Sequence, residues 1–385
     1  MKNIGVVTGT RADYGILKPL ISRLHENDNV NLHLFVTGMH LSQEFGMTVN
    51  EIKKDNFSIT EEVEILLSSD SKKAMIKSMG LAMISFSDIL EKYNLDIIII
   101  LGDRFEALAI AITANTLSIP IAHIHGGEIT EGAIDEGFRH SITKFSQLHF
   151  ASTEEYRKRI IQLGENPKTV FNVGAMGIEN IKTLSLLSKE DVYKNYKLNN
   201  SKELIICTYH PETLSNSNGI DEVKALIKVL KQYSAKYNII ITKSNADANG
   251  RIYNVLWDEF ADEYDDVHSF YSLGMYNYLS VVKHSKFVIG NSSSGIIEVP
   301  SFGIPTINIG NRQRGRVQAK SVINTTANIS DIKNAIEIAI NSDFSNVINP
   351  YEGFLPSKKI FDQILSNINN LNLDKTFFDI EVNLT

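Results

Sequence analysis

The chain alternates short apolar runs with amphipathic stretches over most of its length. The apolar runs are rich in β-branched residues, and several are apolar at consecutive positions, which is typical of strands buried on both faces. Predicted strands cover residues 3–8, 32–37, 96–101, 120–124, 148–151, 203–209, 238–242, 286–289 and 305–309. Predicted helices cover residues 15–24, 72–93, 105–116, 135–145, 154–163, 221–233, 275–284 and 331–341. This alternation indicates βαβ units and a parallel sheet.

The series of strands and helices runs twice along the chain. A first set ends near residue 163 and a second opens at Glu203, so we place the domain boundary at residues 175–200. We therefore expect an α/β protein with two Rossmann-like, doubly wound parallel-sheet domains, at residues 1–180 and 181–370, followed by a C-terminal tail at 371–385. Because such sheets bind ligands at the carboxyl ends of their strands, we expect the domains to face a cleft lined by strand-end loops.

Composition and charge narrow the class of function. The 385 residues are 43% hydrophobic and 22% charged, as in an ordinary globular protein of two domains. The net charge of −7 argues against a nucleic-acid surface, and the single cysteine, Cys207, excludes an intrachain disulfide framework. Apolar runs such as residues 97–101 are far shorter than the roughly 20 residues that span a bilayer. Because the N-terminal apolar stretch is also too short for a secretory signal, we expect a cytoplasmic protein without a membrane anchor.

Two strand-end loops in the first half carry candidate charges. The loop TGTRADYG, residues 8–15, can offer backbone N–H groups and Arg11 to an anion, or it is a tight turn with a surface arginine. It contains neither a Walker A loop nor G-x-G-x-x-G. Asp103 and Arg104 follow the buried run IIIIL, where they form either a functional pair or a structural ion pair with an N-cap.

Residues 123–141 are the densest functional candidate. They include His123, His125, Glu128 and Asp135, and carboxylates gathered in one cleft can supply a general acid and a general base. A metal site is an alternative, because the two histidines share one face of a strand and Glu128 could be a third ligand. No further set of spaced ligands follows, so we expect no metal. A solvated acidic loop without chemistry is the remaining interpretation.

The loops that follow two strands in the second half are less specific. His210 lies between a buried strand and Pro211, so it should project from a loop, although a lone histidine is more often structural than catalytic. The loop SNADANG contains Asn245 and Asp247, which can bind sugar hydroxyls or simply form a turn.

The most specific segment of the second half is residues 289–316. Its strand ends at Gly290, and Ser292, Ser293 and Ser294 introduce a short helix whose hydroxyl and N–H groups suit a phosphate. One turn on, Glu298 can accept hydrogen bonds from a vicinal diol such as ribose, and Arg312 supplies a cation. A serine-rich turn without a ligand is the alternative.

Phosphate chemistry without the usual nucleotide fingerprints points to a two-domain sugar-nucleotide enzyme. One series of motifs runs from residue 8 to residue 316: TGTRADYG, VTGMHLS, LGDRFE, HIHGGE, IDEGFRHSITK, HPETLS, SNAD, GNSSSGIIEVP and NIGNRQRGR. In these motifs the chain resembles the hydrolysing UDP-N-acetylglucosamine 2-epimerases, in the branch that serves bacterial sialic acid synthesis. The resemblance implies a glycosyltransferase-B architecture, a homodimer, no NAD, no obligatory metal, and conversion of UDP-N-acetylglucosamine and water to N-acetylmannosamine and UDP.

The resemblance also implies roles for individual residues. It places Arg11, Arg104, Ser292, Ser293, Glu298 and Arg312 on UDP, with Glu298 on the ribose, and it places Asp103, Asp135 and His210 on active-site positions. Two departures matter. Some relatives have a serine after the RADY motif, whereas this chain has Gly15 there. Many relatives have a catalytic glutamate where this chain has His125. The role of that glutamate therefore falls to His125 or to Glu128.

The chemistry of the expected reaction requires two acid–base groups. The C2 proton of the sugar is not adjacent to a carbonyl, so UDP must leave first to give an oxocarbenium-like centre at C1. Loss of the C2 proton then gives 2-acetamidoglucal, and water adds across its double bond with a proton delivered from the other face. Three alternatives stay open: the same reaction on UDP-N,N′-diacetylbacillosamine for legionaminic acid, a retaining glycosyltransferase, and a nucleotide-sugar sensor.

Overall fold

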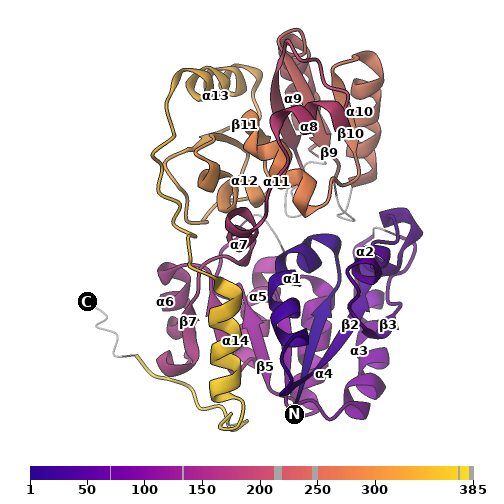
Figure 1. Ribbon diagram of the computed structural model, residues 1–385, viewed down its shortest axis with the longest axis vertical. Helices are drawn as coiled ribbons and strands as arrows, with labels where there is room; N and C mark the ends of the chain where they lie inside the picture. The colour runs from indigo at the N-terminus through magenta and orange to yellow at the C-terminus, as the bar shows by residue number, and fades with distance from the viewer. Residues whose placement is uncertain (70, 132–133, 212–218, 245–249, 372, 381–385) are drawn as a thin grey trace. The chain divides into compact units, whose positions relative to one another are not determined.

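The computed structural model describes residues 1–385 except 70, 132–133, 212–218, 245–249, 372 and 381–385. The chain forms two compact units, each built on one parallel sheet (Figure 1). Unit 1 comprises Met1–Glu128, Asp135–Asn180 and Tyr351–Thr385, and unit 2 comprises Ile129–Ile134 and Ile181–Pro350. Among the described residues, no helix is both long enough and apolar enough to cross a membrane.

The sheet of unit 1 has seven strands in the order β3-β2-β1-β4-β5-β6-β7, and every neighbouring pair is parallel. Its strands are β1 (Lys2–Thr8), β2 (Val30–Thr37), β3 (Ile59–Val63), β4 (Ile97–Leu101), β5 (Ile121–Ile124), β6 (Leu148–Ala151) and β7 (Val170–Asn172). Its α-helices are α1 (Arg11–His25), α2 (Val49–Lys54), α3 (Lys72–Lys92), α4 (Phe105–Thr116), α5 (Asp135–Phe145), α6 (Glu154–Gln162), α7 (Met176–Thr183, which continues into unit 2) and α14 (Pro356–Asn367).

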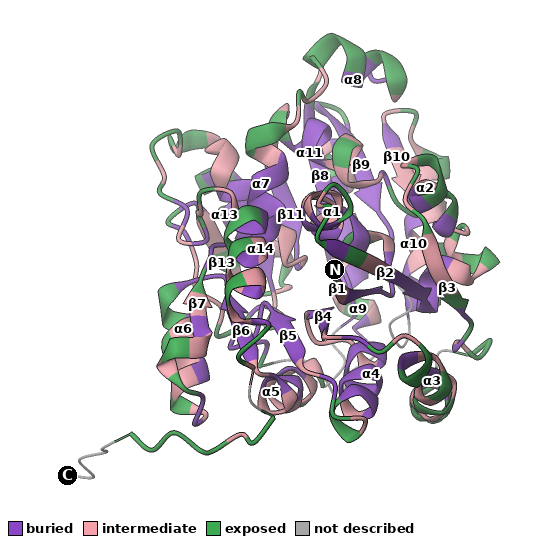
Figure 2. Cartoon of the chain, turned by 60° about the horizontal axis from the view of Figure 1, so that its bottom comes forward, coloured by how far each residue is buried: buried purple, intermediate pink, exposed green. Residues whose placement is uncertain are grey.

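The central strand β4 shows why the apolar runs are continuous. Ile97 and Ile99 pack in one hydrophobic cluster with α1 and α14, whereas Ile98 and Ile100 pack in a second cluster with α3 and α4. Successive side chains of a strand point to opposite faces, so a strand covered by helices on both sides must be apolar at every position. Figure 2 shows the strands of this sheet largely in the buried colour.

The sheet of unit 2 has six strands in the order β10-β9-β8-β11-β12-β13, again all parallel. Its strands are β8 (Glu203–Thr208), β9 (Tyr237–Thr242), β10 (Val267–Phe270), β11 (Ser285–Gly290), β12 (Thr306–Ile309) and β13 (Val322–Thr325). Its α-helices are α8 (Lys189–Asn195), α9 (Ile220–Tyr233), α10 (Gly250–Glu263), α11 (Met275–Lys283), α12 (Ser294–Ile297) and α13 (Ile329–Asn341). Two clusters cover its faces, one with α9, α10 and α13 and the other with α8 and α11.

The predicted strands and helices are confirmed, with ends shifted by a few residues. The largest shift is in α1, which begins at Arg11 rather than residue 15 because the Thr10 hydroxyl accepts a hydrogen bond from the Asp13 N–H and caps the helix. The four strands that the pattern misses, β3, β7, β10 and β13, are the edge strands of the two sheets. An edge strand is buried less completely, so it carries no continuous apolar run. The helices α2, α7, α8, α10 and α14 were also not predicted.

The C-terminal part of the chain belongs to unit 1, whereas the sequence pattern places residues 351–370 in the second domain. Helix α14 supplies Ile360 and Ile364 to the hydrophobic cluster that contains α1. The tail that follows packs on unit 1 as well, because the N–H of Phe378 donates to the carbonyl of Gly164 at 2.9 Å.

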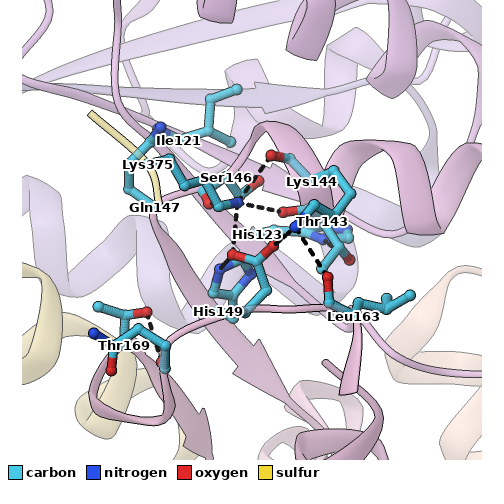
Figure 3. Close-up of polar contacts among 12 residues, drawn as sticks. Ile121, His123, Thr143, Lys144, Ser146, Gln147, His149, Leu163, Thr169 and Lys375 are labelled. Atoms are coloured by element: carbon cyan, nitrogen blue, oxygen red, sulfur yellow. Dashed lines mark hydrogen bonds and ion pairs between the residues drawn. The ribbon is translucent and has the colours of Figure 1, made fainter. Parts of the chain in front are cut away.

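Lys375 fixes this tail to the end of α5 (Figure 3). Its Nζ donates to the carbonyls of Thr143, Lys144 and Ser146 at 3.1, 2.8 and 2.6 Å, which satisfies carbonyls that a helix end leaves without intrahelical partners. Lys375 also pairs with the buried Glu165 at 2.6 Å. Burial alone raises the pKa of Glu165, but hydrogen bonds and charges from His149, Lys144 and Lys375 outweigh burial and bring its pKa to about 2.

We expect Lys375→Met to lower the free energy of unfolding by roughly 2–4 kcal/mol, because it leaves a buried carboxylate and a helix end with fewer donors. The measurement is urea denaturation followed by circular dichroism. Lys358→Met is the matched control, since the Lys358 ammonium makes an exposed i,i+4 pair with Asp362 and no other ion pair among the described residues. This substitution should lower the free energy of unfolding by about 0.3–0.5 kcal/mol. Equal losses in the two variants would contradict this role of Lys375.

Candidate active site

The turn after β4 places Asp103 at the carboxyl end of the sheet in unit 1. Gly102 in this turn has a φ of +76°, which glycine adopts readily. Its carbonyl lies 2.8 Å from Nε2 of His123, and burial lowers the pKa of His123 to about 3. The neutral imidazole therefore donates from Nε2 to Gly102 and holds the turn. The Nε2 of His123 is thus used in holding this turn and is not available to a metal ion.

Arg139 of α5 connects three segments of unit 1 that carry acidic residues. Its side chain is only 1% exposed. Nη1 donates to the carbonyl of Glu128 and to the carboxylate of Glu136, both at 2.8 Å, and Nη2 pairs with the carboxylate of Asp103. A buried guanidinium is tolerated only when its donors are satisfied, so these three contacts fix the β4 turn, the β5 loop and α5 against one another.

His125 and Glu128 form a second contact in this cluster. Nε2 of His125 accepts from the N–H of Met176 at 3.3 Å, so in the neutral ring Nδ1 carries the proton. That nitrogen lies 3.5 Å from Oε1 of Glu128, which also accepts from the hydroxyl of Ser152 at 2.8 Å. His125 has a φ of +65°, a strained conformation for a residue other than glycine and one that recurs at functional sites. Its imidazole thus faces the Glu128 carboxylate.

Asp135 is the first residue of α5 and is partly exposed. Its position in the first turn is favourable for a carboxylate because the helix dipole is positive there. The next residue, Glu136, lies 3.1 Å from the imidazole of His140 as well as pairing with Arg139. Glu128 and Asp135 lie in one segment of the sequence, and Arg139 connects this segment to Asp103 by contacting the Glu128 carbonyl and the Asp103 carboxylate.

Arg11, which follows the loop after β1, is already paired with a carboxylate, so it does not form an open anion site. Its guanidinium pairs with both carboxylate oxygens of Glu51 in α2, at 2.6 and 2.9 Å. A phosphate that binds Arg11 must share the guanidinium with this carboxylate.

Arg104 lies in a small pocket of unit 1 together with two acids, Asp13 and Glu106. The Glu106 side chain is buried and pairs with Nε of Arg104 at 2.6 Å. The pKa of Asp13 is raised to about 6, mainly by burial. The charges of Glu106 and Asp103 also raise this pKa, whereas the charge of Arg104 and the Thr10 hydroxyl lower it. Sequence reasoning missed both acids, because each stands singly in the first turn of a helix rather than in a cluster.

Asp13→Asn should stabilise the fold near neutral pH. A carboxyl whose pKa rises from 3.8 to about 6 on folding holds its proton more tightly in the folded state, so it lowers stability as pH rises through that window. We expect the variant to exceed the wild type by roughly 1–3 kcal/mol at pH 7, with the difference vanishing below pH 4. Urea denaturation across pH tests this, with the exposed Asp28→Asn as control. A difference that does not change with pH would contradict it.

In unit 2, the carboxyl ends of β8 and β11 are joined by Asn291. Its Oδ1 accepts from the N–H of His210 at 2.7 Å, and its Nδ2 donates to the carbonyl of His210 at 2.8 Å. Gly290 makes this approach possible, because a Cβ there would lie 1.9 Å from the carbonyl oxygen of Thr208. His210 is therefore a buried residue with a fixed backbone, and it follows the strand as predicted.

The serine loop after β11 is rich in donors. Among the described residues, the N–H groups of Ser292, Ser293 and Ser294 have no hydrogen-bond acceptor. Helix α12 is only four residues long, so these local donors matter more than a helix dipole. Glu298 follows directly after α12, where it is partly exposed.

Arg312 and Gln313 approach the same loop from the segment after β12. Nη1 of Arg312 and Nε2 of Gln313 both donate to the carbonyl of Asn291, at 3.2 and 2.9 Å. In unit 2 the structure thus brings together His210, the serine loop and Arg312. Asn291 and Gln313 are the residues that sequence reasoning missed, because uncharged amides in loops carry no distinctive pattern.

Two further sequence-based candidates cannot be placed, and the single cysteine has no functional role. Asn245 and Asp247, expected on the sugar, lie outside the described residues. Cys207 is fully buried in β8 and burial raises the pKa of its thiol, so it is no nucleophile. Within the described part of the chain, no three His, Cys, Asp or Glu side chains gather as metal ligands.

Comparison with known proteins places this architecture among the two-sheet folds of the glycosyltransferase-B type, which confirms the predicted fold class. The crystal structure of UDP-GlcNAc 2-epimerase from Neisseria meningitidis bound to UDP-GlcNAc matches with a TM-score of 0.77 at 18% identity, covering 95% of this chain and 100% of that chain. At this identity the likeness shows the fold.

The family follows from sequence. The family model described as UDP-N-acetylglucosamine 2-epimerase matches residues 22–365. The chain is 41% identical to the GDP/UDP-N,N′-diacetylbacillosamine 2-epimerase (hydrolyzing) of Campylobacter jejuni, over 98% of this chain and 99% of that protein. It is also 41% identical to the polysialic acid biosynthesis protein P7 of Escherichia coli, over 91% of this chain and 90% of that protein. The chain belongs to the UDP-N-acetylglucosamine 2-epimerase family, and it is a UDP-sugar 2-epimerase.

Proposed function

We propose that the protein is a hydrolysing 2-epimerase that converts UDP-N-acetylglucosamine and water to N-acetylmannosamine and UDP, in the synthesis of sialic acid for a capsular polysaccharide. The observation that carries the proposal is the occurrence, in one chain of this family, of a donor-rich serine loop and a separate acidic cluster, in which Arg139 contacts the Asp103 carboxylate and the Glu128 carbonyl. The first suits a diphosphate and the second suits proton transfer.

UDP binds to the serine loop in this proposal. The N–H and hydroxyl groups of Ser292, Ser293 and Ser294 contact the diphosphate together with Arg312, and Glu298 accepts hydrogen bonds from the ribose. Arg104 and Arg11 of unit 1 contribute further positive charge. These donors stabilise the negative charge that develops on UDP as it leaves, which lowers the barrier to breaking the bond at C1.

The acids of unit 1 carry out the proton chemistry. The Asp103 carboxylate stabilises the positive charge at C1 once UDP has left. Glu128 then removes the C2 proton, because the acceptor nitrogen of His125 is already occupied by Met176 and its other nitrogen faces Glu128. His125 thus tunes Glu128, and Glu128 takes the role that a glutamate at position 125 has in relatives.

A second acid–base group acts on the opposite face of the sugar. Asp135 and His210 are the candidates for delivering a proton to C2 while water adds to C1, and Asn245 and Asp247 contact the sugar hydroxyls. The residues proposed here need no cofactor or metal.

A second substrate, UDP-N,N′-diacetylbacillosamine, is supported equally by the comparisons. The relative from Campylobacter jejuni is named for UDP-N,N′-diacetylbacillosamine, and its identity of 41% equals that of the Escherichia coli protein named for polysialic acid synthesis. The two substrates differ in the substituent at C4 of the sugar. The family match argues against the retaining glycosyltransferase that the sequence left open, because the family it describes is one of 2-epimerases.

We also propose that the enzyme is a homodimer. Ile76 and Ile84 are 67% and 71% exposed about two turns apart on α3, and an exposed apolar stripe on a helix is typical of an association surface.

The reaction is tested by incubation with UDP-N-acetylglucosamine in D₂O. We expect UDP to be released and one deuterium to appear at C2 of a free sugar with mannose configuration, because the C2 proton is exchanged with solvent. Proton NMR follows both products, and a parallel incubation with UDP-N,N′-diacetylbacillosamine identifies the better substrate by kcat/KM. Release of UDP without deuterium at C2, or transfer of the sugar to an acceptor, would contradict the proposed reaction.

Asp135→Asn and His210→Ala should each lower turnover by about 10²–10⁴-fold while UDP binding is retained, because each removes a proton-transferring group and leaves the serine loop intact. Initial rates and calorimetric UDP titrations measure the two properties. His25→Ala, at an exposed position in the last turn of α1, is the matched control. Near-wild-type turnover in either variant would remove that residue from the mechanism.

A further inference from the structure

Glu106 is a buried acid that the proposed mechanism does not use. Glu106 lies in the first turn of α4 and is 3% exposed. Oε1 accepts from Nε of Arg104 at 2.6 Å, whereas Oε2 is buried and has no hydrogen-bond partner among the described residues. A buried carboxylate is costly, so its position in the chain requires an explanation.

The surrounding backbone is shaped to hold this carboxylate. A Cβ on Gly9 would lie 2.6 Å from Oε1 and 3.0 Å from Cγ of Glu106. Gly38, with a φ of +59°, lies behind it, and a Cβ there would be 2.9 Å from the carbonyl oxygen of Gly9. The loops after β1 and β2 therefore have glycines where the Glu106 side chain needs room, so a larger residue at position 9 would collide with the carboxylate.

Arg104 is held by this contact at one edge. Its side chain is 24% exposed while that of Glu106 is 4% exposed, so the pair runs from the interior of unit 1 toward solvent. A charge-assisted bond to Nε fixes the plane of a guanidinium, because its five N–H donors form a rigid fork. Nη2 also contacts the sulfur of Met39 at 3.7 Å. The free rotation of a long arginine side chain is thereby reduced.

We infer that Glu106 is a positioning residue, which holds the guanidinium of Arg104 in the orientation that binds the diphosphate of the nucleotide sugar. The inference rests on the proposed function, since it needs Arg104 to contact UDP. Glu106 itself does not touch the substrate. Its effect is to remove, before UDP arrives, the conformational freedom that Arg104 would otherwise lose on binding.

Asp13 should increase the loss of UDP affinity that follows the removal of Glu106. It lines the same pocket, and its charge acts on Arg104 in the present arrangement without a hydrogen bond between their side chains among the described contacts. When Glu106 is removed, Asp13 is the remaining acid among the residues that line the pocket. We expect its charge then to draw Arg104 toward it and away from the diphosphate.

The test is calorimetric titration of UDP into the full-length protein and three Glu106 variants. Glu106→Leu should weaken UDP binding by about 10–100-fold, the loss typical of a hydrogen bond to a charged group. Glu106→Asp keeps the charge but is one methylene too short to reach Nε, so it should also weaken binding. Glu106→Gln keeps an acceptor at the same place and should bind UDP within a few-fold of wild type. KM should rise more than kcat falls in the weakened variants.

A double-mutant cycle with Arg104→Ala separates positioning from general damage. If Glu106 acts through Arg104, the double variant Glu106→Leu/Arg104→Ala binds UDP no more weakly than Arg104→Ala alone. Glu154→Leu is the matched control, since Glu154 also lies in the first turn of a helix of unit 1 and pairs with an arginine, at an exposed position. It should bind UDP like the wild type.

Each contrary result has its own meaning. Additive losses in the double variant, or a Glu106→Gln variant as weak as Glu106→Leu, would overturn the inference and leave the proposed reaction standing. Arg104→Ala that binds UDP like the wild type would overturn both the inference and the assignment of Arg104 to UDP. The D₂O incubation tests the reaction separately. If Glu106→Leu fails to fold, the comparison of Glu106→Asp with Glu106→Gln decides the question.

Discussion

Parallel strand pairing is the constraint on which the rest of this structure depends. Both sheets are parallel throughout, so all strands of one sheet run in the same direction. All loops that follow strands therefore lie at the carboxyl end of their sheet, while the helices that return the chain cover both faces. The candidate side chains follow β1, β4, β5, β8, β11 and β12, and they come from segments far apart in the sequence. Within each unit, the parallel sheet brings these loops to the same end, and the loops carry the candidate functional side chains.

The two units hold their candidate groups in different ways. In unit 1 the organising contact is ionic: Arg139 is buried and satisfied by carboxylates and a carbonyl from three segments. In unit 2 it is neutral, because the Asn291 side chain pairs in both directions with the backbone of His210. The difference fits the proposed division of labour. The Asp103 carboxylate, proposed to stabilise positive charge at C1, is held in place by an opposite charge, whereas neutral amide contacts hold the loop proposed to bind UDP.

Most of the fold could be predicted from the sequence, and the reason is visible in β4. Five consecutive apolar residues, Ile97–Leu101, have to be buried on both faces, so the pattern itself specifies a central strand between helices. The edge strand β3, with the sequence ITEEV, has one apolar residue at each end and polar residues between them, and no such pattern marks it. The position of α14 in unit 1 depends on tertiary packing against α1, which local pattern does not encode.

The candidate site was predictable to a lesser degree. Clusters such as HIHGGE and GNSSSG draw attention because several functional residue types stand together. Asp13 and Glu106 stand singly, and only the pairing of β1 with β4 brings their helix starts into one pocket. The pairing of Arg11 with Glu51 was invisible for the same reason, since 40 residues separate the two partners.

The central claim is that the loops at the carboxyl ends of the strands bind the nucleotide sugar. Hydrogen–deuterium exchange of the backbone amides, measured by mass spectrometry with and without UDP, tests it most directly. We expect UDP to slow exchange in peptides that cover residues 290–298, because the N–H groups of the three serines become donors to the diphosphate. Unchanged exchange in those peptides at saturating UDP, with protection confined to other parts of the chain, would contradict it.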